Sequence, residues 1–120
     1  MVRLRSFTKQ LICPDCGDVI GDATLRPLTG WLAVRLAGGG LAGPSEGAVQ
    51  LNVAKRRLTE APADGRDRAQ RQLAFVERSL GEQIYDLACP RGHREFITAP
   101  QIIRAMHRAQ GGWARLPSTG

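Results

Sequence analysis

The sequence predicts an α+β fold, built from small β-hairpins around a metal, an inserted helix and a C-terminal helix. Three observations support this prediction. Two cysteine- and histidine-bearing turns lie far apart in the chain, and short apolar runs typical of strands flank them. Residues 65–80 and 99–110 carry apolar side chains at helical spacing. The chain has 120 residues, which is enough for one domain and short for two.

The first turn contains Cys13 and Cys16, a C-x2-C pair that one tight turn can direct at a single metal ion. Gly17 follows, where the chain needs a positive φ just past the second ligand. We expect a strand over residues 9–13 before the turn. Residues 17–21 predict a short strand that ends in a further turn.

The segment after this turn gives weaker signals. Residues 31–36 are mostly apolar and fit either a strand or a short helix. Residues 37–47 are rich in glycine and predict a flexible loop. The next three apolar residues alternate with polar ones, which predicts a short strand; they are Val49, Leu51 and Val53.

The clearest helix is predicted over residues 65–80. Asp64 or Asp67 is placed to cap its start, and Gly81 is placed to end it. Four apolar residues recur at helical spacing and form one stripe: Ala69, Leu73, Val76 and Leu80. Packing inside the domain is the simpler interpretation of this stripe, and an exposed docking surface for a protein partner through Leu73 and Val76 is the other.

The second turn contains Cys89 and His93, separated by three residues, with Gly92 at the point where the chain must bend. The residues on either side predict a hairpin over 84–98. Thr98 and Gln101 form a capping-box pattern with a proline between them, which predicts a helix over 99–110. Two glycines end this helix. Phe96 and the residues after the helix, Trp113 and Leu116, are expected to pack into the core.

The two turns together supply three thiols and one imidazole, which is a complete tetrahedral ligand set for Zn²⁺. The metal ligands are Cys13, Cys16, Cys89 and His93. Because four protein ligands close the site, the zinc is expected to be structural. Alternatives are a redox pair at the first turn, a disulfide, and catalytic zinc, each of which the sequence favours less. His107 is expected to be a surface or partly buried side chain.

These turns resemble the zinc ribbon, a zinc-finger family in which two β-hairpin turns bring their ligand pairs together. The resemblance covers roughly residues 9–21 and 84–98 and implies Cys13 and Cys16 as one pair, with Cys89 and His93 as the other. The C-x3-H pair and the long linker depart from the family pattern. A treble-clef finger is the nearby alternative. We therefore predict a single zinc-binding domain over residues 1–120, with residues 22–83 inserted between the two turns.

The charge of the chain indicates the kind of molecule that it binds. The net charge is +6, and the chain has 15 arginines and two lysines, a bias that a GC-rich genome would also produce. Zinc ribbons often act in nucleic-acid machinery, so the resemblance implies binding to nucleic acid or a ribonucleoprotein assembly. Basic residues cluster at both ends of the chain, which supports this. The candidate contacts are Arg3, Arg5, Lys9, Arg91, Arg94, Arg104 and Arg108.

The sequence disfavours several classes of protein. No apolar stretch is long enough for a transmembrane helix, and the basic start lacks the apolar segment of a signal peptide. The expected compartment is therefore the cytoplasm. No nucleophile with a base is evident, so we expect neither an enzyme nor a small-molecule substrate. The alternative to nucleic-acid binding is a protein-interaction adaptor.

Overall fold

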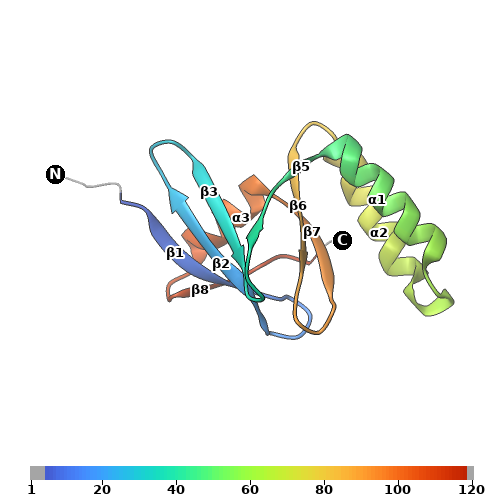
Figure 1. Ribbon diagram of the computed structural model, residues 1–120, viewed down its shortest axis with the longest axis horizontal. Helices are drawn as coiled ribbons and strands as arrows, with labels where there is room; N and C mark the ends of the chain where they lie inside the picture. The colour runs from blue at the N-terminus through green and yellow to red at the C-terminus, as the bar shows by residue number, and fades with distance from the viewer. Residues whose placement is uncertain (1–4, 119–120) are drawn as a thin grey trace.

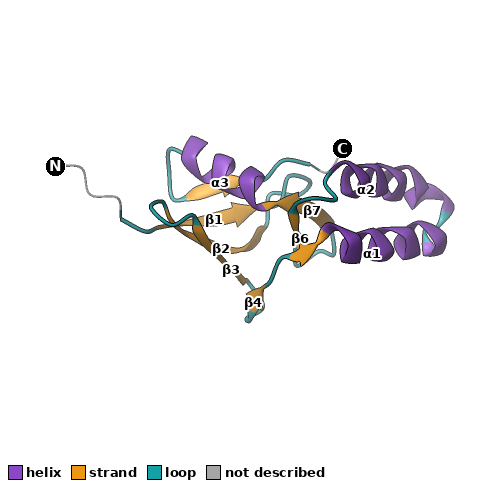
Figure 2. Ribbon diagram, turned by 90° about the horizontal axis from the view of Figure 1, so that it is seen from above, coloured by secondary structure: helices purple, strands orange, loops and turns teal. Residues whose placement is uncertain are grey.

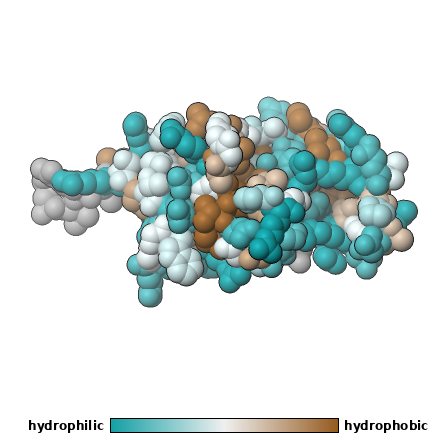
Figure 3. Space-filling view, turned by 60° about the horizontal axis from the view of Figure 1, so that its bottom comes forward, coloured by the Kyte–Doolittle hydropathy of each residue, from teal (hydrophilic) through white to brown (hydrophobic). Residues whose placement is uncertain are grey.

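The computed structural model describes residues 5–118 and confirms the α+β class. The described residues form eight strands in two sheets and three α-helices. The sheets and one helix form the body of the molecule, and the other two helices project from one end (Figure 1). The face drawn in Figure 3 is largely hydrophilic, with separate hydrophobic patches. None of the described helices is long and apolar enough to cross a membrane.

The larger sheet has five strands in the order β4-β3-β2-β1-β8. Four of them form an antiparallel meander, and β8 adds to the free edge of β1 in parallel. Their bounds are β1 Phe7–Ile12, β2 Val19–Arg26, β3 Trp31–Leu36, β4 Leu41–Ala42 and β8 Trp113–Arg115. Residues 31–36, whose sequence fits either a strand or a short helix, thus form strand β3.

The smaller sheet has three antiparallel strands in the order β5-β6-β7, with bounds Ser45–Glu46, Gln83–Ala88 and Arg94–Thr98. β6 and β7 form the hairpin that the sequence predicts. The segment expected to be a loop over residues 37–47 carries both β4 and β5, which join the two sheets.

Helix α3, Ala99–Arg108, packs against β6, β7 and β8. It buries Ile102 and Met106 in a core that the two sheets share. Its predicted capping box is confirmed, because the Gln101 N–H donates to the Thr98 hydroxyl and the Thr98 N–H donates to the Gln101 side chain. This cap fixes the direction in which the helix leaves β7.

Helices α1, Gly47–Glu60, and α2, Arg66–Arg78, form an antiparallel pair that runs side by side (Figure 2). A short 3-10 turn at Ala63–Gly65 separates them. A second apolar cluster joins this helical hairpin to β6 and β7. Its buried members are Ala54, Phe75, Val76, Ile84 and Phe96.

The predicted strand around Val49 is wrong, because the segment lies within α1. The buried positions of α1 are Gly47, Gln50 and Ala54, which follow helical spacing although two of them are not apolar. A Cβ at Gly47 would lie 2.5 Å from the Leu80 carbonyl oxygen. The tight approach of the turn after α2 to the start of α1 thus selects a glycine where a sequence pattern would need a hydrophobic residue.

The helix predicted over residues 65–80 is present as α2, but neither Asp64 nor Asp67 caps it through its side chain. Three of the four stripe residues pack inward: Ala69 and Val76 are buried, and Leu73 packs against the second cluster. The fourth, Leu80, lies past the end of α2 and is exposed. The docking surface predicted at Leu73 and Val76 is therefore wrong, because the α1–α2 contact and β6–β7 already occupy it.

The two residues after α3 that were expected in the core differ in their burial. Leu116 is buried as expected, but Trp113 is 63% exposed, so its expected place in the core is wrong. The chain leaves α3 as a strand, and alternation along β8 turns Ala114 inward and Trp113 outward.

Candidate metal centre

The four predicted ligands lie at the tips of two hairpins. Cys13 and Cys16 belong to the β1–β2 connection, and Cys89 and His93 belong to the β6–β7 connection. The two tips meet at one end of the sheets (Figure 1). More than 70 residues of chain thus separate two turns that become neighbours in space.

The ligand atoms fit a single small ion. One atom from each of the four residues lies within 4.8 Å of all the others. The Sγ atoms of Cys16 and Cys89 are 3.7 Å apart, and Cys89 Sγ lies 3.3 Å from His93 Nδ1. Zinc–sulfur bonds of about 2.3 Å in a tetrahedron place two sulfurs about 3.8 Å apart. The donor set and its spacing therefore suit tetrahedral Zn²⁺.

Each turn is closed by its own backbone. The Cys13 N–H donates to the Asp18 carbonyl, and the Cys89 N–H donates to the His93 carbonyl, each at 2.9 Å. Gly17, just past Cys16, and Gly92, at the bend before His93, adopt φ values of +79° and +87°, as expected from these positions. Each loop is thus closed by hydrogen bonds between residues that are close together in the sequence.

The thiols differ in their readiness to ionise. The backbone N–H of Asp18 lowers the pKa of Cys16, but burial and the thiols of Cys13 and Cys89 outweigh it and raise this pKa to about 11. Burial raises the pKa of Cys89, but hydrogen bonds from the His93 and Arg91 backbone and the His93 ring lower it to about 7. Metal binding must therefore displace a proton from Cys16, whereas Cys89 already has thiolate character near neutral pH.

Ion pairs hold the two tips together around the ligands. Arg91 in the second turn reaches Asp18 in the first, with an N–O distance of 2.9 Å. Arg68 of α2 contacts Asp15 at 2.6 Å and the buried Glu95 at 2.7 Å. A hydrogen bond from Arg68 holds the pKa of Asp15 below its usual range. Helix α2 is thus tied to the first ligand turn and to β7, the strand that follows the second.

Arg68 and its neighbour Gln72 also satisfy one backbone group beside the site. Both side chains donate to the Arg94 carbonyl, at 3.2 Å and 2.9 Å. A bidentate pair between Arg57 and Asp86 fastens α1 to β6. These contacts are not predictable from the sequence, because no local pattern marks which arginine meets which acid across 27 or 53 residues.

Several predicted nucleic-acid contacts have internal partners instead. Arg91 pairs with Asp18, and Arg94 lies 3.7 Å from Asp86. Lys9 donates to the carbonyls of Ala109 and Gly111, at the end of α3. Arg5 is exposed, and Arg3 lies outside the described residues. Lys9 therefore holds the backbone just past the end of α3.

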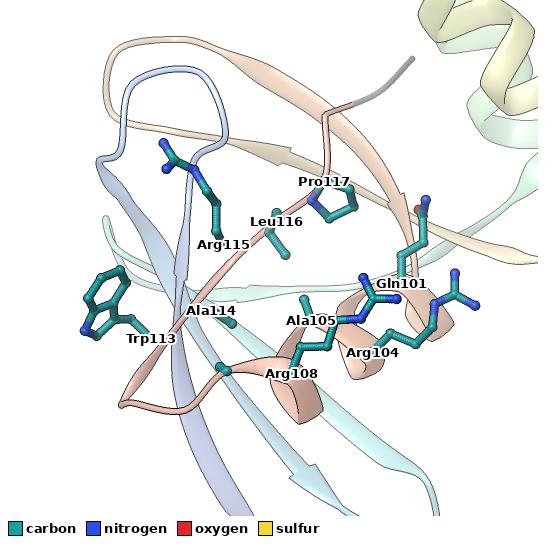
Figure 4. Close-up of a pocket in the computed structure, with 10 residues that line it drawn as sticks. Gln101, Arg104, Ala105, Arg108, Trp113, Ala114, Arg115, Leu116 and Pro117 are labelled. Carbon is teal, nitrogen blue, oxygen red and sulfur yellow. The ribbon is translucent and has the colours of Figure 1, made fainter.

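Arg104 and Arg108 are placed differently. They line a surface hollow of about 680 Å³ between α3 and the segment that includes β8. Figure 4 shows their guanidinium groups beside each other over α3. All ten described lining residues are neutral or basic, and neither arginine forms an ion pair within residues 5–118. Two like charges one turn apart are mildly repulsive, so the pair is available to an anion.

Three residues of interest were not among the predicted contacts: Trp31, Trp113 and Arg115, all exposed. No pattern in the sequence marks the tryptophans, because exposure depends on which face of a strand meets the core. His107 is exposed on α3 against Phe7, with ring centroids 5.5 Å apart, and lies outside the ligand group, as expected.

No protein-family model matches the chain, and neither the curated proteins nor the solved structures contain a significant match.

Proposed function

We propose that the chain is a structural zinc protein of the zinc-ribbon type. The observation that carries this proposal is the close approach of three thiols and one imidazole from two hairpin tips. Soft thiolate ligands with one imidazole favour zinc over harder cations. A zinc ion held by four protein ligands has no open position for a substrate, so the proposed role is binding rather than catalysis.

Zinc would add stability that the small core lacks. Structural zinc contributes on the order of 10 kcal/mol in small zinc domains. The reduced thiols that it requires fit a cytoplasmic location, which is also part of the proposal.

Native mass spectrometry and thermal unfolding test the zinc proposal together. We expect one zinc ion per chain and a large fall in Tm after treatment with a strong chelator, reversed by adding zinc. The matched control is His107→Ala, which removes the other histidine and should keep the metal. A chelated protein with unchanged Tm and near-ultraviolet circular dichroism would contradict the proposal.

We further propose that the chain binds nucleic acid through a basic surface around α3 and β8. This surface runs around the β8 edge, with Arg104 and Arg108 of α3 on one side of the strand and Arg115 on the other, and none of the three has a carboxylate partner among the described residues. The net charge of +6 adds a long-range attraction for phosphate. The alternative is a protein adaptor that docks through the apolar stripe of α2. This alternative is less well supported, because Val76 of that stripe is buried.

Salt-dependent binding tests this second proposal. A labelled oligonucleotide should bind at low salt and weaken steeply as salt rises, because phosphate contacts release counterions. Arg104→Glu with Arg108→Glu should weaken binding at least tenfold. The control is Arg56→Glu with Arg71→Glu, an equal charge change at exposed sites on the helical hairpin. Equal losses in the two double variants would mean that net charge alone, and no particular surface, attracts the ligand.

A further inference from the structure

The five-stranded sheet has one covered face and one open face. The covered face packs into the shared core through residues such as Leu11, Ala23 and Val34, all fully buried. Strand register places the alternate residues together on the open face. These residues are Thr8, Gln10, Asp22, Thr24, Arg26, Trp31, Ala33, Arg35, Leu41, Trp113 and Arg115.

The open face carries both tryptophans of the chain. Trp31 is 49% exposed and Trp113 is 63% exposed. Trp31 pairs with Arg26 across β2–β3, and Trp113 pairs with Gln10 across β8–β1. Figure 4 shows Trp113 and Arg115 projecting from β8 on the side away from the arginines of α3. Two large aromatic rings are thus left in solvent on one sheet face, on β3 and on the edge strand β8, where no core requires them.

The charge of this face is mainly positive. Arg26, Arg35 and Arg115 lie on it, and Asp22, opposite Arg35 in the register, is its one acid among the described residues. The Arg26 guanidinium lies 4.8 Å from the centroid of the Trp31 ring. This cation–π contact orients the indole and places a positive charge beside it.

The spacing suits an extended polymer. Trp31 and Trp113 are three strands apart, about 14 Å, and four residues apart along the strands, about 13 Å, so their separation is about 20 Å. A single strand of a few nucleotides spans this distance. The two shallow hollows that flank these rings, one on the sheet face and one beside β8, are both lined by arginine.

We propose that single-stranded nucleic acid lies across the open face of the five-stranded sheet, with bases stacked on Trp31 and Trp113. Arginines of the face and of the adjacent β8 edge contact its phosphates. This inference rests on the proposed nucleic-acid function and adds the strandedness of the ligand and the surface that contacts its bases. Only unpaired bases offer their flat faces to aromatic side chains, whereas a duplex keeps them stacked inside.

Another protein chain is a poorer fit for this surface. A peptide that extends the sheet would pair with a free strand edge and leave the face itself uncontacted. An apolar partner would meet threonine, glutamine and arginine across most of the face.

Tryptophan fluorescence tests the proposal directly, because both emitting residues lie on the proposed surface. The probe is a single-stranded oligodeoxythymidine of about 12 nucleotides, within the site size of compact single-strand-binding folds. We expect it to quench emission in the wild type. The single-tryptophan variants Trp31→Phe and Trp113→Phe should both be quenched, because each retains one stacking indole.

Binding of the labelled probe, measured by anisotropy, gives the energetic test. Trp31→Leu and Trp113→Leu keep an apolar side chain but remove the ring system, and each should weaken binding roughly tenfold. The matched control is Val49→Ala, an exposed apolar residue on α1 that should leave binding unchanged. Circular dichroism and zinc content confirm that each variant is folded.

The outcomes separate the two proposals. A probe that binds without quenching, and is weakened by the Arg104/Arg108 changes but not by the tryptophan changes, would overturn the open-face proposal and leave the nucleic-acid function intact. Duplex DNA that binds as tightly as the single strand would overturn the strandedness. Background affinity for both probes at low salt would overturn the nucleic-acid function itself, and this inference with it.

Discussion

At the scale of single residues, the metal centre depends on short loops with strict backbone requirements. Gly17 and Gly92 lie at the two ligand turns and adopt positive φ angles. A positive φ costs residues other than glycine about 1–2 kcal/mol. These positions were predictable because the need arises within a few residues of the ligands. The partners of Arg68 were not, since they come from distant parts of the chain.

Replacing Gly92 by alanine should destabilise the zinc-bound protein by about 1 kcal/mol, because no nearby atom obstructs a Cβ there and the cost is the strained φ alone. Urea unfolding in the presence of zinc measures this. Gly43→Ala is the control, since that glycine has open space and no positive φ. Equal stability of the two variants would mean that the second turn tolerates another backbone conformation.

Arg68 should be the most important single cation in the fold. Glu95 is 1% exposed, so Arg68→Gln removes the positive charge from a buried carboxylate as well as from Asp15. Arg68 itself is partly exposed, so we expect a loss of about 2 kcal/mol, below the full cost of breaking a buried pair. Arg66→Gln, at an exposed position on the same helix, is the control and should cost little. A loss no larger than that of the control would show that the Arg68 clamp contributes nothing to stability.

At the scale of elements, the sequence predicted those whose signals are local. The hairpin at the second turn, the α2 helix and the capping box of α3 follow from turn residues, apolar spacing and cap chemistry. Helix α1 was missed because Gly47 and Gln50 occupy buried positions where a pattern would need apolar residues. Strand β8 was missed because a three-residue strand depends on the β1 edge that it joins.

The cap of α3 gives a prediction at this scale. Thr98→Val keeps the shape of the side chain but removes the hydroxyl that accepts from Gln101, and should destabilise the protein by about 1 kcal/mol. Thermal unfolding of the zinc-bound form measures the change. Thr59→Val is the control, since its hydroxyl only donates back to Lys55 within α1. A loss confined to the control would contradict the capping role.

At the scale of the whole molecule, the four ligands join the two sheets at one point. The first pair belongs to the five-stranded sheet and the second pair to the three-stranded sheet, so a bound ion would fasten one to the other. The sequence was sufficient to predict this link, because three cysteines and one histidine formed a complete ligand set. It did not predict which sheet face stays open, because that depends on the joint packing of α3, β6 and β7.

Cobalt substitution tests the central claim most directly. We expect the protein to take up one Co²⁺ ion per chain and to show the intense visible absorption of tetrahedral cobalt with thiolate ligands, and zinc should displace it. Cys89→Ser should alter the spectrum, because it removes one of the three thiolates, while His107→Ala should leave it unchanged. A pale spectrum typical of six-coordinate cobalt, or one that Cys89→Ser does not alter, would contradict the assignment of Cys13, Cys16, Cys89 and His93 as one metal centre.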